Sequence, residues 1–240
     1  MSDIDDIPEF IVRLSLDFNG IRAVGSKLTP TKWKLVAEVL YDEFPEDEEE
    51  DDFGVKVAIA KIRYWFDNVF SGSMIFDGGN EFAHRSFFDD DGRRAVDNNV
   101  VILPAPPTDD LLMEVLHSKL NALGAPYIQF GTMELTSDDD NQLSYIFTGL
   151  GETNLPSITD WVGERAFFDK PWWARDDGST YDSIPDEDAD LSQKPTSAFS
   201  LDFVRKSLES KNDQEAVIIR PATFNPTIIA GGLDSDGNSD

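Results

Sequence analysis

Polar and hydrophobic side chains alternate at the start of the chain. Across residues 10–18 every second position is apolar: Phe10, Val12, Leu14, Leu16 and Phe18. Because successive side chains of a strand point to opposite faces, this period of two predicts a half-buried β-strand. The Asn-Gly pair at 19–20 is a turn signal, so we expect the strand to end there.

Wider apolar spacings predict four helices further along the chain. Over 29–44, the spacing of Trp33, Val36, Ala37, Leu40 and Phe44 fits one helical stripe, with Thr29 as N-cap and Pro30 in the first turn. A second stripe covers 51–70, where Asp51 or Asp52 would cap the helix. Thr108 would cap a third helix ending near Gly124, and residues 200–210 form a fourth, shorter one.

The remaining periodic segments predict strands. Residues 73–76 and 99–103 are short apolar runs, and 127–147 indicates a hairpin with a bulge at Gly131. Further strands are expected at 216–220 and 226–230. Residues 149–198 show no clear period, and an irregular stretch of this length is usually functional or partly disordered.

These elements do not alternate regularly between strand and helix, which favours an α+β fold. We expect one domain over 1–230, with a mostly antiparallel or mixed sheet and about four helices packed on it. A division into two lobes near the proline-rich residues 104–107 is the alternative. Residues 231–240 are expected to form a flexible acidic tail.

The composition excludes several classes of function. The chain has 47 acidic and 20 basic residues, a net charge of −27, and no cysteine. A charge of this size repels phosphate backbones and favours a basic partner, so direct nucleic-acid binding is not expected. No apolar run approaches the length of a membrane span, and the N-terminus is acidic where a signal peptide would be basic. We therefore expect a cytoplasmic protein without membrane contact.

Two segments are the candidate binding sites. The first is a run of seven consecutive acidic residues, of which helix capping would account for one or two: Glu46, Asp47, Glu48, Glu49, Glu50, Asp51 and Asp52. The second combines aromatic and charged side chains typical of interaction hot spots: Trp172, Trp173, Arg175, Asp176 and Asp177. Alternatively, the acidic run is only a solvated linker, and the two tryptophans pin a long loop onto the domain.

Catalytic signatures are absent from the sequence. His84 and His117 are the only histidines, and no nucleophile-elbow, phosphate-loop or zinc-protease motif occurs. Carboxylates alone can hold magnesium, so Asp89, Asp90 and Asp91, or Glu209 with Lys211, are the alternative centre of a metal-dependent enzyme. We assign no catalytic residue, metal ligand or cofactor.

The leading hypothesis is a non-enzymatic protein that occupies a basic surface of a partner, for example the surface of a nucleic-acid-binding enzyme. In composition the chain is similar to nuclease inhibitors, immunity proteins and DNA mimics, which are also small and acidic. A metal-dependent enzyme acting on nucleotides or nucleic acid is the second hypothesis. A structural or assembly component of a larger particle, such as a virus, is the third.

Overall fold

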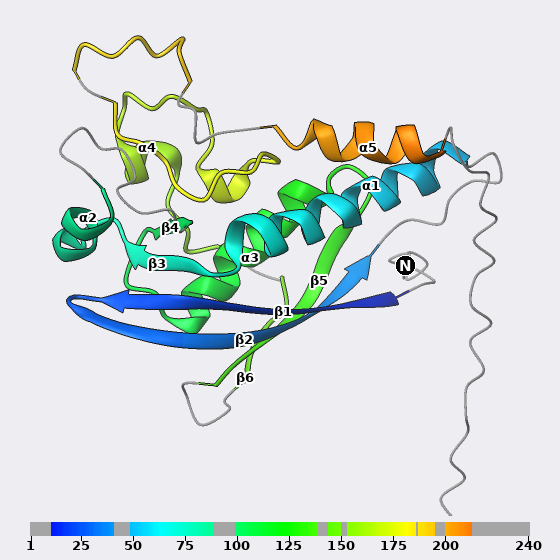
Figure 1. Ribbon diagram of the computed structural model, residues 1–240, viewed down its shortest axis with the longest axis horizontal. Helices are drawn as coiled ribbons and strands as arrows, with labels where there is room; N and C mark the ends of the chain where they lie inside the picture. The colour runs from blue at the N-terminus through cyan, green and yellow to red at the C-terminus, as the bar shows by residue number, and fades with distance from the viewer. Residues whose placement is uncertain are drawn as a thin grey trace, which may run out of the picture.

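The computed structural model describes residues 11–40, 49–88, 99–138, 144–149, 153–185, 187–194 and 200–212. Within these ranges the chain is a single α+β domain, as predicted, with one six-stranded mixed sheet and five α-helices. The strand order is β4-β3-β1-β2-β5-β6. Figure 1 shows α1 and α3 on one face of the sheet, with α5 packed beside α1.

The centre of the sheet is a long antiparallel hairpin of β1 (Ile11–Val24) and β2 (Lys27–Leu40). The first strand is confirmed, but the turn predicted at 19–20 is wrong, because the chain reverses at Gly25, whose φ is 57°. A Cβ atom at Gly20 would lie 3.1 Å from the carbonyl oxygen of Ser73 and 3.3 Å from the Trp33 ring. Glycine at this position therefore permits close packing against β3.

The helix predicted over 29–44 is wrong, since its first part is strand β2 and residues 41–44 lie outside the described residues. Trp33, Leu35, Ala37 and Val39 are buried at every second position, whereas Lys32 and Lys34 are exposed. The predicted helical stripe would leave Leu35 and Val39 off its buried face. The strand period instead buries both of them. Pairing with β1 and β5 on either side then fixes the strand.

The parallel half of the sheet follows. Helix α1 (Glu49–Trp65) and a π-helical turn (Phe66–Phe70) lead to β3 (Ser73–Asp77), which is parallel to β1. Helix α2 (Glu81–Phe87) connects β3 to the parallel strand β4 (Val100–Leu103). The predicted helix 51–70 and both predicted strands are confirmed, whereas α2 falls in a segment for which the sequence predicted no element. Its cap is Asn80, whose side chain accepts a hydrogen bond from the Ala83 amide.

The predicted elements after β4 are also present. Helix α3 (Asp109–Gly124) leads to β5 (Gln129–Ser137) and β6 (Ser144–Phe147), which form the expected hairpin. The register between β2 and β5 shifts between Ala37 and Val39, so the predicted bulge at Gly131 is confirmed. Helix α4 (Ile158–Val162), a 3₁₀ turn (Trp172–Ala174) and α5 (Asp202–Asn212) complete the described chain. The strands predicted at 216–220 and 226–230, and the tail, lie outside it.

Two groups of buried side chains hold these layers together. The larger one lies between the sheet and helices α1 and α3, and includes Phe18, Trp33, Leu35, Ile62, Trp65 and Leu116. The smaller one packs α2 against β3 and β4, with Met74, Phe76, Ala83, Phe87, Val100 and Ile102. Because the long segment after β6 covers β4, that strand is buried along its whole length.

Candidate functional site

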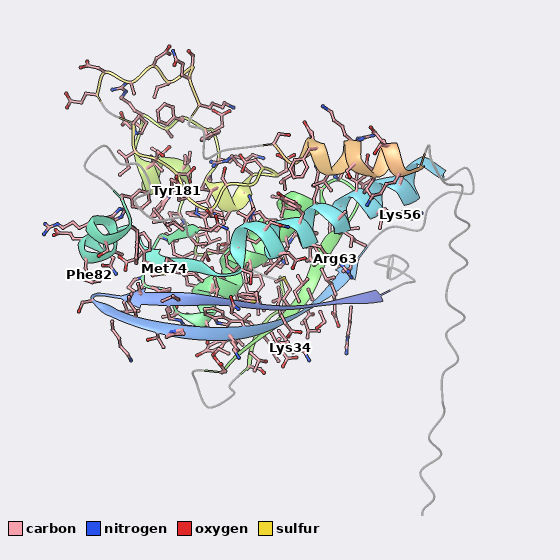
Figure 2. The ribbon with its side chains drawn as sticks, in the orientation of Figure 1. Lys34, Lys56, Arg63, Met74, Phe82 and Tyr181 are labelled. Carbon is pink, nitrogen blue, oxygen red and sulfur yellow. The ribbon has the colours of Figure 1, made fainter. Side chains whose placement is uncertain are left out.

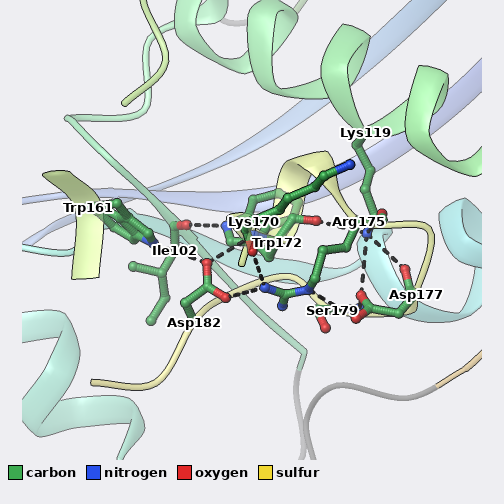
Figure 3. A network of polar contacts seen from close by, with 9 residues as sticks. All are labelled: Ile102, Lys119, Trp161, Lys170, Trp172, Arg175, Asp177, Ser179 and Asp182. Atoms are coloured by element: carbon green, nitrogen blue, oxygen red, sulfur yellow. Dashed lines mark hydrogen bonds and ion pairs between the residues drawn. The ribbon is translucent and has the colours of Figure 1, made fainter. Parts of the chain in front are cut away.

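A buried lysine fixes the irregular segment 161–182, here called the anchored segment, to helix α3. The Nζ atom of Lys119 donates hydrogen bonds to the carbonyl oxygens of Trp172 (3.0 Å), Arg175 (2.8 Å) and Asp177 (2.8 Å) (Figure 3). It also lies 3.7 Å from the Asp177 carboxylate. An ammonium group has three donors, and three backbone oxygens accept them. One side chain therefore determines the path of the segment.

Arg175 also points into the segment rather than toward solvent. Its side chain, which is 10% exposed, donates to Asp182 Oδ1 at 2.6 Å and to Asp177 Oδ2 at 3.0 Å. The other carboxylate oxygen of Asp182 accepts from the Trp161 indole (3.2 Å) and the Trp172 amide (2.9 Å). Figure 3 shows these contacts converging on Asp182. The buried cations are thus used for internal structure.

The structure corrects the predicted surface role of the two adjacent tryptophans. Trp172 is fully buried and Trp173 is 2% exposed, and both belong to the main core. The Trp172 indole also donates to the carbonyl oxygen of Ile102 at 2.9 Å. The alternative interpretation, that both residues pin a long loop onto the domain, therefore fits the structure. Of the five candidates at 172–177, only Asp176 is exposed.

The anchored segment also covers the outer edge of β4. The amide of Ile102 donates to the carbonyl oxygen of Thr180 at 3.1 Å, and the Thr180 hydroxyl donates to the carbonyl oxygen of Val100 at 2.6 Å. These bonds satisfy backbone groups that an edge strand would leave open. The segment is therefore a structural layer of the domain despite its lack of periodicity.

Burial and charge act in opposite directions on the Lys119–Asp177 pair. Burial lowers the pKa of Lys119 to about 7, although the nearby Asp177 carboxylate opposes the change. Burial raises the pKa of Asp177, but Lys119, Ser179 and Arg175 together outweigh it, so this pKa is lowered overall. Because Asp177 keeps 18% of its side chain exposed and Lys119 keeps none, we assign the main desolvation cost to the lysine.

This pKa predicts how stability changes with pH. In the unfolded chain Lys119 has the ordinary lysine pKa of 10.5, so between pH 7 and 10.5 the unfolded state binds more protons than the folded state. The contribution of Lys119 to the free energy of unfolding should therefore rise with pH, by about 1–3 kcal/mol from pH 7 to pH 9. Urea denaturation of the wild type and of Lys119→Met at both pH values measures it.

The exposed Lys170 is the matched control for this test. Lys170→Met should keep the wild-type change in stability with pH, whereas Lys119→Met should lose most of it. An identical change in the wild type and in Lys119→Met would contradict the assignment of a lowered pKa to this lysine.

The surface of residues 153–194 has an excess of acid. Among its described residues seven exposed carboxylates face solvent: Asp160, Glu164, Asp169, Asp176, Glu187, Asp188 and Asp190. The same described residues include three exposed cations: Arg165, Lys170 and Lys194. The network around Lys119 adds to this imbalance, because Arg175 is turned inward onto Asp177 and Asp182 and is not a further cation at the surface.

The acidic run 46–52 is only partly described. Glu46, Asp47 and Glu48 lie outside the described residues, while residues 49–52 begin helix α1. Backbone placement therefore puts four successive acidic positions in the first turn of that helix, where negative charge complements the helix dipole. The run does not lie between two helices, as the sequence suggested, because the element before it is strand β2.

A cavity of about 610 Å³ opens beside α2, at the carboxyl ends of the parallel strands β3 and β4. Its walls are mostly apolar and aromatic, and include Phe88, Ile102, Trp161, Tyr181 and Ile184. His84, Arg85 and Asp182 supply polar groups. Figure 2 places Tyr181 above the sheet and Phe82 on the nearby α2, whereas Lys34 lies on the opposite side of the sheet.

The described residues show no arrangement typical of a metal centre. They contain no cluster of three His, Asp or Glu side chains that could hold an ion. His84 and His117 are each engaged by a backbone carbonyl, of Gly78 (3.0 Å) and Phe130 (2.9 Å) respectively. Glu209 lies on helix α5 and pairs with Arg205, while residues 89–91 are outside the described ranges.

The comparisons with known proteins give no family for this chain. No protein-family model matches it, and no curated protein matches its sequence. In addition, none of the described helices is both long and apolar enough to cross a membrane.

Sequence analysis missed the residues that organise this region. Lys119 follows Val115 and Leu116 by four and three residues, so it occupies the apolar stripe of α3. A lysine in such a stripe indicates a buried partner. Trp161 and Tyr181 gave no comparable signal, because they come together only through the path of the anchored segment.

Proposed function

We propose that this protein is a non-enzymatic binding protein that uses acidic surface to occupy a basic surface of a partner protein. The observation that supports the proposal is the exposed acid of residues 153–194, part of which lies on the segment that Lys119 and Arg175 hold in place. The carboxylates of Asp176 and its neighbours would pair with lysine and arginine side chains of the partner. The acidic run 46–52 would extend the same attraction at the start of α1.

The contacts of Lys119 and Arg175 order this acidic surface before a partner binds. Binding is stronger when the binding groups are ordered beforehand, since less conformational entropy is lost. Lys119 holds the backbone on both sides of Asp176, through hydrogen bonds of 2.8 Å to the carbonyl oxygens of Arg175 and Asp177. Arg175 in turn pairs with the Asp182 carboxylate at 2.6 Å. Because Arg175 is turned inward, it does not compete at the surface with the cations of the partner. Charge complementarity of this kind mainly increases the association rate and the specificity.

A set of four charge-neutralising substitutions tests the proposal. Asp169→Asn, Asp176→Asn, Glu187→Gln and Asp188→Asn together remove four exposed charges without touching the buried network. We expect this variant to lose its basic partners in affinity purification at about 50 mM salt, with the captured proteins identified by mass spectrometry. Wild-type capture should fall steeply by about 500 mM salt, where exposed charges are screened over a few ångströms.

The matched control neutralises the same number of exposed acids elsewhere: Asp17→Asn, Asp67→Asn, Asp110→Asn and Asp202→Asn. This control should still capture the basic partners at low salt. If both variants lost the partners equally, total charge rather than the surface of residues 153–194 would account for binding. Partners that are acidic, or that stay bound unchanged at high salt, would contradict the function itself.

A further inference from the structure

The cavity beside α2 has the construction of a binding pocket. Ligands of open sheets with parallel strands commonly bind at the carboxyl ends of those strands, and Gly78 directly follows β3 there. A volume of about 610 Å³ lies in the range of small-molecule and side-chain pockets. The mostly apolar lining, with a few polar groups, is also typical of such pockets.

The aromatic wall of the pocket is formed in advance. The Trp161 indole is fixed by its hydrogen bond to Asp182 and packs against Trp173, with ring centroids 5.6 Å apart. A Cβ atom at residue 78 would lie 2.9 Å from the ring atom Cη2 of Trp161, so the glycine lets the indole lie directly against the end of β3. Phe88 and Tyr181 meet edge to face, with centroids 5.9 Å apart. An entering group would thus meet ordered rings.

The charges around the pocket decide which group fits. Asp182 is compensated by Arg175, and the exposed Arg85 is paired with Glu81 at 3.2 Å. Asp160 directly precedes Trp161. Arg165 binds the backbone carbonyls of Glu187 and Ala189, which places residues 187–190, three of them acidic, near α4. The lining is therefore mostly apolar, while the surrounding surface carries exposed carboxylates.

We propose that this pocket receives an aromatic side chain of the basic partner, flanked in the partner's sequence by lysine or arginine. The inference rests on the proposed function, because the acidic surroundings select the flanking cations. The aromatic anchor supplies buried apolar area and is held between Trp161 and Ile184. Anchors in central pockets with a charged rim account for most of the energy of many interfaces.

Three blocked pentapeptides test the pocket on the full-length protein by amide chemical-shift mapping. Each has phenylalanine at its centre. The four flanking residues are all lysine in the first peptide, all serine in the second and all glutamate in the third. The lysine peptide should bind most tightly and should shift the resonances of Trp161, Val162, Tyr181 and Ile184. Replacing its phenylalanine by alanine should weaken binding about tenfold, the loss expected for one buried aromatic side chain.

A pair of isoleucines provides matched variants, because both are exposed and neither belongs to the buried network: Ile184, 77% exposed, at the pocket and Ile146, 68% exposed, on β6. Ile184→Ser should raise the Kd of the lysine peptide about fivefold, the effect of losing part of one apolar contact. Ile146→Ser should leave the Kd unchanged. Equal effects of the two substitutions, or no shifted resonance at the pocket, would overturn the proposal.

The peptides also separate this proposal from the proposed function. If the alanine and phenylalanine peptides with lysine flanks bind equally, the pocket is excluded while the acidic surface remains a binding site. If serine and lysine flanks give equal affinity at low salt, the pocket takes apolar groups but the basic partner is excluded. Tighter binding of the glutamate peptide would mean that Arg85 selects the ligand, which overturns both the cationic flanks and the acidic rim.

Discussion

Lys119→Met should lower the free energy of unfolding by about 3 kcal/mol at pH 7 and release the anchored segment from α3. Methionine preserves most of the side-chain volume but leaves the carbonyl oxygens of Trp172, Arg175 and Asp177 without the donor that they share. A buried acceptor without its partner costs about 1–3 kcal/mol, and the Asp177 carboxylate also loses one of its two cationic neighbours. The cost of burying the ammonium, which substitution removes, offsets part of this sum.

Two measurements check this prediction. Urea denaturation gives the global stability, and limited trypsin cleavage after Arg175 reports local opening of the segment, which should increase at least about tenfold. Lys170→Met is the control, because Lys170 lies in the same segment with an exposed side chain and only its backbone oxygen accepts a bond from Arg175. If trypsin cleaved Lys119→Met no faster than the wild type, the segment would stay docked without the lysine.

Asp109→Asn should destabilise the protein by about 3–4 kcal/mol. The Asp109 side chain is 1% exposed and accepts hydrogen bonds from Arg22, from the Trp33 indole (2.9 Å) and from the Ser137 hydroxyl (2.7 Å). Three strands, β1, β2 and β5, are thus tied to the first residue of α3. Asparagine keeps the shape but loses the charge opposite Arg22 and turns one acceptor into a donor. Breaking a buried ion pair by changing one partner typically costs 3–5 kcal/mol.

The neighbouring Asp110→Asn is the control for this substitution. Asp110 is exposed in the same helical turn, so the helix dipole loses a similar charge in both variants. Its effect should stay within about 0.5 kcal/mol, as for most surface substitutions. Thermal and urea unfolding measure both. If the two variants lose equal stability, the dipole rather than the buried network accounts for the role of Asp109.

Local periodicity was sufficient to predict most of the fold. The alternation at the start of the chain, the apolar stripe of α1 and the short runs that became β3 and β4 each match one element. The prediction of β2 was wrong because Trp33, Val36, Ala37 and Leu40 fit a helical period. The face that the strand buries consists instead of Trp33, Leu35, Ala37 and Val39. What decides between the two is pairing with β1 and β5, which are distant partners that a local pattern does not contain.

The candidate site was less predictable for the same reason. Trp172 and Trp173 have the composition of an interaction surface, yet their position depends on Lys119, more than fifty residues earlier in the chain. Of the neighbouring acidic candidates, Asp176 is exposed whereas Asp177 is half-buried against Lys119, a difference that the sequence pattern does not contain. The pocket could not be predicted, since its walls come from α2, β4 and the anchored segment.

The coverage of β4 by Thr180 also has a consequence for the newly synthesised protein. On the ribosome, the apolar strand Val100–Leu103 is made about eighty residues before the threonine that closes its edge. Until then the nascent chain presents unpaired backbone groups on an apolar strand, the arrangement that recruits other strands and leads to aggregation. The high negative charge of the growing chain opposes such contacts between molecules, so the composition protects the fold before the anchored segment exists.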